Sequence, residues 1–407
     1  MIDTIWQRAF KFIPYILPFL LIFSRSAADL TVLIVGILFL VHSNKYNKWM
    51  WTKHLWFKCS LVFWLYLLFI NAPLSSNFTE SFLYSLAFIR WPIFAAAIAF
   101  WILKDSDMQK RFLLSMLIVL FFICFDTWWQ YFFRQDIFGY VPLNEVRLTG
   151  PFRNNNAVPG IFIARLMGLL LYVAVIFPPL RSDKKIISIC FIVSVMMLAS
   201  VYITGERMAL ILACIVSFIT ITALYLEYFN KEKKLFLLLT TILGLTIICI
   251  LLFMPQMFER QINESIIKFS DITSSDYGLV FESAYKVWAQ SPLFGVGMHQ
   301  YSSECILLGL KTTGPGVCMH PHNIIFHLLS EMGVIGFVLY YIMIFSIVLT
   351  SLKTHYIRKN YLFLFFGFSL LFVSFFPLIV GMSLFNNWIG ATIWLLVGWA
   401  LAQGERR

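Results

Sequence analysis

The chain has 407 residues, of which 60% are hydrophobic and only 13% are charged, whereas a soluble domain carries about 25% charged residues. Its apolar residues come in runs of about 20 separated by short polar stretches, a pattern typical of a polytopic membrane protein. The net charge of +11 does not predict nucleic-acid binding, because basic loop residues set the orientation of a membrane protein. We therefore expect membrane lipids as partners and no nucleic acid.

The apolar runs predict a single polytopic membrane domain over residues 1–407. The first run, from Trp6 to Phe23, is expected to stay as a helix, because it lacks the layout of a signal peptide. Since helices satisfy their backbone hydrogen bonds within lipid, the expected fold is all-α with about twelve transmembrane helices. The expected spans are 6–23, 28–43, 55–72, 81–103, 112–133, 156–178, 185–203, 208–228, 235–254, 323–350, 361–382 and 385–402.

Basic residues gather in alternate loops of this arrangement. Because cytoplasmic loops carry an excess of Lys and Arg, these loops and both termini are predicted to be cytoplasmic. The basic stretches are Lys45–Lys53, Lys104–Arg111, Arg181–Lys185, Lys231–Lys234, Lys353–Lys359 and Arg406–Arg407.

The loops on the opposite side are longer, at residues 134–155 and 255–322, and the second is too long for a simple connector. Its stretches 257–270 and 279–291 have apolar residues at three- and four-residue spacing, which predicts short amphipathic helices. These helices lie either on the membrane surface as a lid or in a packed extracytoplasmic subdomain. Cys305 and Cys318 share this loop and would form a disulfide only in an oxidising compartment.

Three arginines are predicted on the outer face, where basic residues are unexpected. Arg207 follows Glu206 in a tight turn between two spans. Its guanidinium group can bind phosphate oxygens in bidentate fashion, pair with Glu206, or extend to lipid headgroups. Arg147 and Arg153 border a segment rich in turn formers and precede Asn154–Asn156.

Three further ionisable residues, Arg90, Asp126 and Arg165, fall within predicted spans. Charged groups are costly in lipid, so these residues are expected to be paired or functional. Asp126 can pair with either Arg90 or Arg165, and the sequence leaves both pairings open.

His322 stands where the long outer loop enters an apolar helix. An imidazole has an ordinary pKa of ~6.5 and can take a proton from a hydroxyl near neutral pH, although a histidine here can also serve only as a helix cap. His320 and His322 form an H-x-H pair without a nearby carboxylate or cysteine set, so no metal site is expected. From its residues alone, the chain is a membrane enzyme or transporter acting on an anionic, lipid-like substrate.

Four segments resemble motifs of the O-antigen ligase and O-antigen polymerase superfamily. Arg147–Asn156 resembles its R-L-x-G-x-F-x-N-x-N loop, and Gly205–Arg207 resembles its S-x-S-R-G turn with the arginine kept. Ser291–Gly297 resembles its P-L-x-G-V-G segment. His322–Asn323, followed by Gly333 and Gly336, fits H-[NSQ]-x9-G-x-x-G. The motifs cover about residues 147–340 in the family's order.

The resemblance implies a metal-independent, inverting glycosyltransferase of the bacterial inner membrane, with a periplasmic active site and no cofactor. The donor would be a glycan on undecaprenyl pyrophosphate, and the acceptor of a ligase would be the lipid A-core oligosaccharide. By this analogy His322 deprotonates or orients the acceptor hydroxyl, and Arg207 binds the departing pyrophosphate. The expected substrate-binding residues are Arg147, Arg153, Asn154, Asn156, Lys286 and Asn323.

One motif departs from the family. A second arginine is expected in the loop helix before P-L-x-G-V-G, but that register holds Tyr277, four residues before Phe281. Lys286, Lys268 or Arg260 could replace it, although a lysine does not reproduce a bidentate clamp.

Two other functions stay open. A polymerase shares the fold and chemistry of a ligase but extends the lipid-linked glycan. The single large late loop and the His-Asn motif favour the ligase. A lipid-linked oligosaccharide transporter would instead use the charged residues within the spans.

Overall fold

The computed structural model describes residues 12–153, 158–176, 184–227, 232–272, 275–310, 317–358, 361–377 and 385–402. Within these ranges every regular element is a helix, apart from an isolated β-bridge between Asn144 and Arg147. The predicted all-α fold is therefore confirmed for the described part of the chain. The predicted start of the first span at Trp6 lies outside these ranges, and the first described helix begins at Ile13.

In the first third of the chain, polar caps fix the starts of the helices that begin at Arg25 and Ser106. Ser24 Oγ accepts a hydrogen bond from the Ala27 N–H at 3.3 Å, and Asp105 Oδ1 accepts one from the Met108 N–H at 2.9 Å. The elements are α2 (Ile13–Phe23), α3 (Arg25–Lys45), η1 (Met50–Lys53), α4 (Leu55–Tyr66), η2 (Leu67–Asn71), η3 (Ala72–Leu74), α5 (Phe78–Phe88), α6 (Arg90–Ala97), η4 (Ile98–Ile102) and α7 (Ser106–Phe133).

The remaining elements include short helices in the long outer loop. Residues 257–270 and 279–291, predicted as amphipathic helices, coincide with α13 to α14 and with α15. The elements are α8 (Pro159–Leu166), α9 (Leu169–Ile176), α10 (Lys184–Ile203), α11 (Arg207–Glu227), α12 (Lys233–Phe253), α13 (Pro255–Phe258), η7 (Glu259–Asn263), α14 (Glu264–Ser270), α15 (Asp276–Trp288), α16 (Tyr301–Leu307), α17 (Ile324–Arg358), α18 (Tyr361–Phe375) and α19 (Asn387–Ala402).

The apolar helices make the protein a membrane protein. Among the described residues, six helices are long and apolar enough to cross a membrane: Arg25–Lys45, Leu55–Leu74, Phe78–Ile102, Ser106–Phe133, Arg207–Glu227 and Ile324–Lys353. Other apolar helices are shorter, such as Ile13–Phe23 and Asn387–Ala402. Each of the twelve predicted spans coincides, over its described residues, with one to three consecutive helical elements, but twelve crossings remain a prediction.

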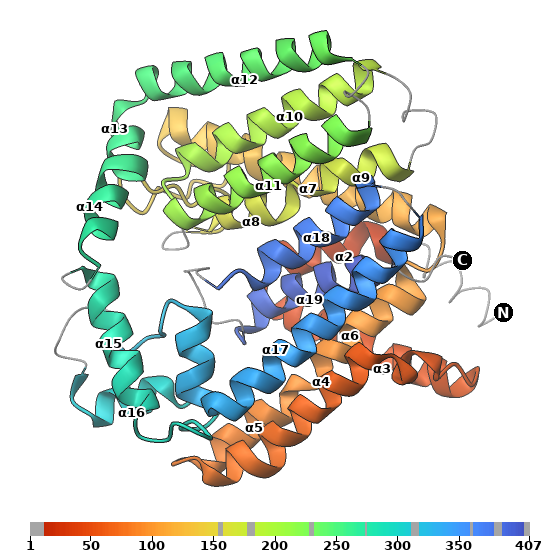
Figure 1. Cartoon of the computed structure of the whole chain (residues 1–407), viewed down its shortest axis with the longest axis vertical. Coiled ribbons are helices and arrows are strands. Elements are labelled where there is room, and N and C mark those ends of the chain that lie inside the picture. The colour runs from red at the N-terminus through yellow and green to blue at the C-terminus, as the bar shows by residue number, and fades with distance from the viewer. Residues whose placement is uncertain are drawn as a thin grey trace.

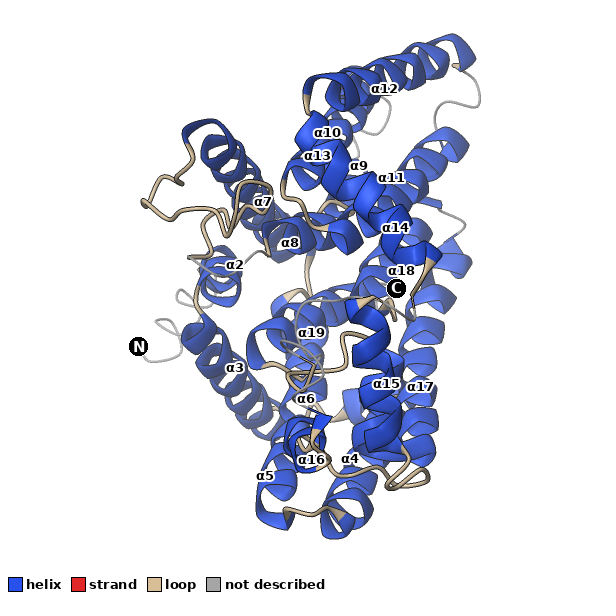
Figure 2. Cartoon of the chain, turned by 90° about the vertical axis from the view of Figure 1, so that its left-hand side faces the viewer, coloured by secondary structure: helices blue, strands red, loops and turns tan. Residues whose placement is uncertain are grey.

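The long helices run in one general direction, and the helices of the outer loop cross their ends. Figure 1 shows α10, α11, α12 and the main part of α17 along one diagonal, with α13, α14 and α15 across it. Figure 2 looks at that end of the bundle, where α13, α14 and α15 form a column in front of the other helices. We call this end the loop-covered end.

The centre of the bundle is built around α19, which is buried from Trp388 to Ala402. The Trp399 ring lies 4.8 Å from Phe112 of α7, 5.6 Å from Tyr172 of α9 and 5.8 Å from Phe366 of α18, measured between ring centroids. Edge-to-face aromatic packing of this kind ties four helices together.

Candidate active site

A break in α17 sets the geometry at the loop-covered end. Gly333 has φ of 66° and ψ of −175°, which divides α17 into two helices. Segment Ser291–Gly297 bridges the break. The Val334 N–H donates to Pro292 O at 3.0 Å, and the Val296 N–H donates to Ser330 O at 2.9 Å. The P-L-x-G-V-G segment thus satisfies backbone groups that the interrupted helix leaves unpaired.

Both glycines at this joint are required by close backbone contact. A Cβ at Gly333 would lie 2.3 Å from Leu293 O, and a Cβ at Gly295 would lie 2.3 Å from the Glu331 carbonyl carbon. Gly295 also has a positive φ of 75°, which favours glycine. Gly295 of the P-L-x-G-V-G segment and Gly333 of the His-Asn motif are therefore both needed for the same close backbone contact.

Two side chains from the first half of the chain hold the joint in place. The Tyr66 hydroxyl donates to Met332 O at 2.7 Å. Asn71 Nδ2 donates to Phe294 O at 2.8 Å and to Glu331 O at 2.9 Å. Since Tyr66 and Asn71 belong to the α4–η2 helix, the start of α17 is anchored to the bundle.

Asn323 caps α17, and His322 precedes it. Asn323 is buried, and its Oδ1 accepts from the Ile325 N–H at 2.8 Å and the Phe326 N–H at 3.3 Å. His322 adopts a left-handed conformation with φ of 51°. The Asn323 side chain therefore caps the helix, and the imidazole of His322 is not needed as a cap.

The His322 imidazole is suited to accept a proton. Burial lowers its pKa below the ordinary value of 6.5, so the ring is neutral near pH 7. Its Nδ1 atom is buried and has no hydrogen-bond partner among the described residues. A buried polar atom without a partner is unusual in folded proteins and marks a candidate functional group.

Arg207 and Arg260 form a shared ion pair with Glu264. The Glu264 carboxylate contacts the guanidinium groups of both arginines, at 3.3 Å from Arg260 Nη1. Arg207 Nε donates to Arg260 O at 3.1 Å, and Arg260 Nε donates to Gly205 O at 3.1 Å. The alternative partner Glu206 is thus not the ion-pair partner of Arg207.

Arg147 completes an arginine cluster with Arg207 and Arg260. Burial, then the charges of Arg207 and Arg147, lower the pKa of Arg260 to about 10, so these three cations lie within electrostatic range. The Leu148 N–H donates to Thr204 O at 3.2 Å, which docks the Arg147 loop onto the turn before Arg207. Three cations against the Glu264 carboxylate leave a formal charge of +2, which suits an anionic ligand.

Glu206 adds little negative charge to this cluster at neutral pH. Burial raises its pKa to about 8, although Arg147, Arg165 and hydrogen bonds from the Gly160 and Ile161 N–H groups act in the opposite direction. The Gly160 N–H donates to Glu206 Oε1 at 2.9 Å. Glu206 therefore anchors the start of α8 as a largely protonated group.

The other predicted binding residues do not belong to the arginine cluster in the described part of the chain. Arg153 is exposed with φ of 67°, while Asn154 and Asn156 lie outside the described residues. Lys286 is exposed and its Nζ lies 2.6 Å from Glu282 Oε1 on the same helix. Of the three candidates to replace the family's second arginine, Arg260 is the one that joins Arg207. Tyr277, at the family's register, lies within electrostatic range of Arg260.

The two pairings considered for Asp126 are both wrong. Asp126 Oδ1 accepts a hydrogen bond from the Ile137 N–H at 3.0 Å. Arg90 Nη1 lies 3.2 Å from Asp29 Oδ1, and its Nη2 donates to Asn387 Oδ1 at 2.5 Å. Arg165 is buried close to Glu206. These partners lie far apart in the sequence, so no local pattern could reveal them.

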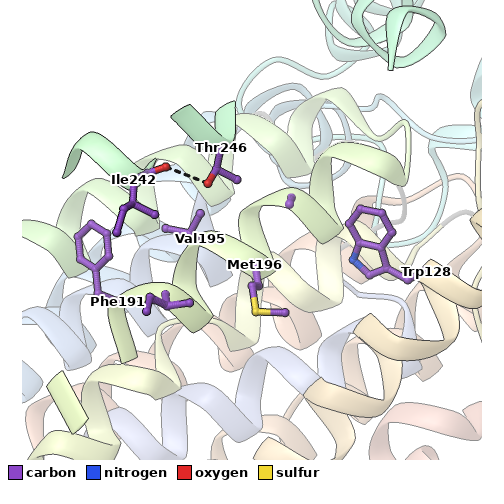
Figure 3. Close-up of a pocket in the computed structure, with 8 residues that line it drawn as sticks. Trp128, Phe191, Val195, Met196, Ile242 and Thr246 are labelled. Atoms are coloured by element: carbon purple, nitrogen blue, oxygen red, sulfur yellow. Dashed lines mark hydrogen bonds between the residues drawn. The ribbon is translucent and has the colours of Figure 1, made fainter. Parts of the chain in front are cut away.

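An apolar cavity of about 180 Å³ lies between α7, α10 and α12. Figure 3 shows its lining by Trp128, Phe191, Val195, Met196, Ile242 and Thr246. The two polar groups in this lining are already used, because Thr246 Oγ1 donates to Ile242 O at 2.8 Å and Trp128 Nε1 donates to Ser200 Oγ at 2.9 Å. The cavity therefore suits a hydrocarbon chain, and Ala199 in its wall is one helical turn from Ile203, which precedes the Arg207 turn.

A disulfide joins Cys305 to Cys318, which resolves the alternative left open by the sequence. It ties α16 to the turn that leads to His322. Among the described residues, no group of three or more His, Cys, Asp or Glu side chains could hold a metal ion.

The helix ends that carry the candidate site residues lie at one side of the bundle. Figure 1 shows the start of α11, the α13–α14 column and the start of α17 at the loop-covered end. In the described part of the chain, no hydrogen bond or ion pair joins His322 directly to the arginine cluster. The structure thus presents a neutral imidazole and a cationic cluster as two separate groups at the same end.

Comparison with protein families matches residues 192–341 to the family described as O-antigen ligase. This segment is similar to the O-antigen ligase superfamily. The predicted resemblance is therefore confirmed over the part of the chain that carries Arg207, Arg260 and His322. The family covers O-antigen ligases and polymerases, and its members are glycosyltransferase-like enzymes. No match was found among curated proteins.

Proposed function

We propose that the protein is an O-antigen ligase that transfers a glycan from undecaprenyl pyrophosphate to a lipid A-core hydroxyl at the periplasmic face of the bacterial inner membrane. The observation that carries this proposal is the charge of the arginine cluster. A pyrophosphate that bridges a lipid and a sugar has two ionisable oxygens, and the formal charge of +2 on Arg147, Arg207, Arg260 and Glu264 complements it.

The apolar cavity supports a lipid-linked donor. Its wall on α10 leads to the turn that carries Arg207, so a polyprenyl chain in the cavity would present its pyrophosphate to the cluster. Burial of the chain would contribute binding free energy in proportion to the apolar area that it covers. A donor with a hydrocarbon tail and an anionic head matches both parts of the site.

In the proposed reaction, His322 takes the proton of the acceptor hydroxyl as the acceptor oxygen bonds to the anomeric carbon. The bond from that carbon to the pyrophosphate oxygen breaks on the opposite side, so the configuration inverts. The arginine cluster stabilises the charge that develops on the departing pyrophosphate, which is preorganised electrostatic catalysis. Guanidinium groups here supply the positive charge that a divalent cation supplies in other phosphate sites.

The disulfide supports the proposed location of the site. Disulfides form and persist in oxidising compartments such as the periplasm, and Cys305–Cys318 lies in the same long loop as His322. The same loop-covered end holds the arginine cluster, so a periplasmic loop would place the whole site in the periplasm.

The test is glycan transfer in a bacterial strain that lacks its own ligase, with lipopolysaccharide read as ladders on a gel. Wild type should cap the lipid A-core, while His322→Ala and Arg207→Ala should lose about 10²-fold or more of the transfer rate. Membrane levels of each variant, measured by immunoblot, serve as the control for folding.

Two results would reject the ligase. Longer chains in a polymerase-deficient strain, with no capping, would identify the protein as a polymerase. Movement of lipid-linked glycan across the membrane that persists in His322→Ala would identify a transporter.

A further inference from the structure

His320 lies beside His322, separated from it by Pro321. The His322 N–H donates a hydrogen bond to His320 Nδ1 at 3.0 Å. The two imidazole centroids are 3.8 Å apart with an interplanar angle of 54°. The His320 side chain therefore contacts both the backbone and the ring of the histidine that the proposed reaction uses.

The backbone of His322 needs support. Its φ of 51° is a left-handed conformation that costs a residue with a Cβ about 1–3 kcal/mol unless its surroundings maintain it. The hydrogen bond to His320 Nδ1 closes a turn across Pro321, in the way that an Asn or Asp side chain closes a turn two residues on. The contact thus fixes the direction in which the His322 ring leaves the backbone.

His320 is itself held by its place in the fold. It lines a small cavity of about 80 Å³ that also contacts His299, His327 and Glu331. Glu331 Oε2 lies 3.3 Å from His327 Nε2 and accepts from the His299 N–H at 3.0 Å. His299, His327 and Glu331 therefore form a connected polar network in the cavity wall.

We propose that His320 is a positioning residue, whose unprotonated Nδ1 holds His322 in the orientation needed to accept the proton of the acceptor hydroxyl. This inference rests on the proposed glycosyl transfer. Because Nδ1 accepts a hydrogen bond, the neutral His320 ring must carry its proton on Nε2. Protonation of Nδ1 would remove the acceptor and release His322.

Three substitutions separate this role from others. In His320→Asn, the Asn side-chain oxygen can take the position of Nδ1 and keep the turn. His320→Gln places its polar atoms one bond farther out, and His320→Ala removes them. With purified protein in vesicles, kcat at saturating donor and acceptor should fall about 10- to 100-fold in His320→Ala and His320→Gln. It should stay within about threefold of wild type in His320→Asn.

The pH profile supplies a readout that a merely structural role would not change. Below neutral pH the wild-type rate should fall with protonation of both His320 and His322. The fall should be one power of proton concentration shallower in His320→Asn, because asparagine does not titrate. The other titratable groups lining the cavity (Tyr84, His299, Tyr301, His327 and Glu331) are common to both proteins.

A nitrogen-15 NMR measurement of His320, assigned by comparison with His320→Asn, tests the tautomer without any assay of transfer. A proton on Nε2 supports the proposal, and a proton on Nδ1 overturns it. Full activity in His320→Ala, or equal loss in His320→Asn and His320→Ala, also overturns it. Absence of transfer in wild type would instead reject the proposed function and leave the NMR result to judge the positioning role.

Discussion

Glu206 sets how the charge of the arginine cluster changes with pH. Its folded pKa of about 8 is raised by burial, while an unfolded glutamate titrates near pH 4.3. Its contribution to stability is therefore fully present below about pH 4.3 and is lost as pH rises toward 8. Above that pH, the ionised carboxylate also cancels part of the cluster's positive charge.

We predict that Glu206→Gln makes the protein less sensitive to alkaline pH. Glutamine resembles the protonated carboxyl and can still accept from the Gly160 N–H. Thermal unfolding in detergent between pH 5 and pH 9 should show wild type losing at least about 1 kcal/mol that the variant keeps. A parallel pH dependence in both proteins would contradict the assignment. Under the proposed function, the KM for the donor should rise above pH 8 in wild type only.

Arg260 is predicted to serve as the second donor-binding arginine. Arg260→Ala should lower transfer about 10²-fold, and Arg260→Lys should restore only part of this loss because an ammonium group cannot form a bidentate clamp. Lys286→Ala is the matched control. Lys286 is exposed and paired with Glu282, so its loss should change the rate by less than about twofold. Radiolabelled donor gives the initial rates, and a larger effect at Lys286 than at Arg260 would reverse the assignment.

Residue types and local spacing identified Arg207, Arg147 and His322 as candidates, because arginines on an outer face and a histidine at a membrane boundary are rare. The partners of these residues could not be predicted. Glu264 is 57 positions after Arg207 and meets it only because the α13–α14 column folds across the start of α11. Hydrophobic periodicity indicates that a helix is amphipathic but not which helix end it covers.

At the level of elements, the break in α17 is the feature that could not be predicted from the sequence. Residues 323–350 read as one apolar span, and glycine at 333 is compatible with a continuous helix. The break depends on backbone groups of Ser291–Gly297, which approach from a separate loop. The two amphipathic helices of that loop were predictable, since their apolar spacing is local.

We predict that Gly333→Ala prevents assembly of this joint. A Cβ there would meet Leu293 O at 2.3 Å, and the backbone conformation is one that only glycine adopts readily, so the cost should exceed about 3 kcal/mol. Gly244→Ala in α12 is the control, because among the described residues no atom outside the helix's own backbone lies within 4 Å of its new Cβ. That change should be neutral or stabilise by about 0.5–1 kcal/mol. Thermal unfolding of the purified variants distinguishes these outcomes, and equal melting temperatures would refute the tight joint.

For the whole molecule, the alternation of basic loops predicts on which side of the membrane each helix end lies. The structure adds an independent constraint, because the disulfide, the arginine cluster and His322 all lie at the loop-covered end. The two arguments use different physics. One rests on charge bias during membrane insertion, and the other on the redox state of the compartment. The orientation in the membrane that both arguments predict can be tested by cysteine labelling at two serine positions.

Ser303 and Ser106 form a matched pair for this test. Both are exposed, Ser303 in α16 at the loop-covered end and Ser106 at the start of α7 beside Lys104. In a protein whose free cysteines (Cys59, Cys124, Cys190, Cys214 and Cys249) are replaced by alanine, Ser303→Cys should react with a membrane-impermeant maleimide in intact cells. Ser106→Cys should react only after the cells are opened, because a basic loop is expected to stay in the cytoplasm. Labelling of Ser106→Cys from outside, with protection of Ser303→Cys, would show that the protein has the opposite orientation in the membrane. The candidate site would then lie in a different compartment from the proposed acceptor.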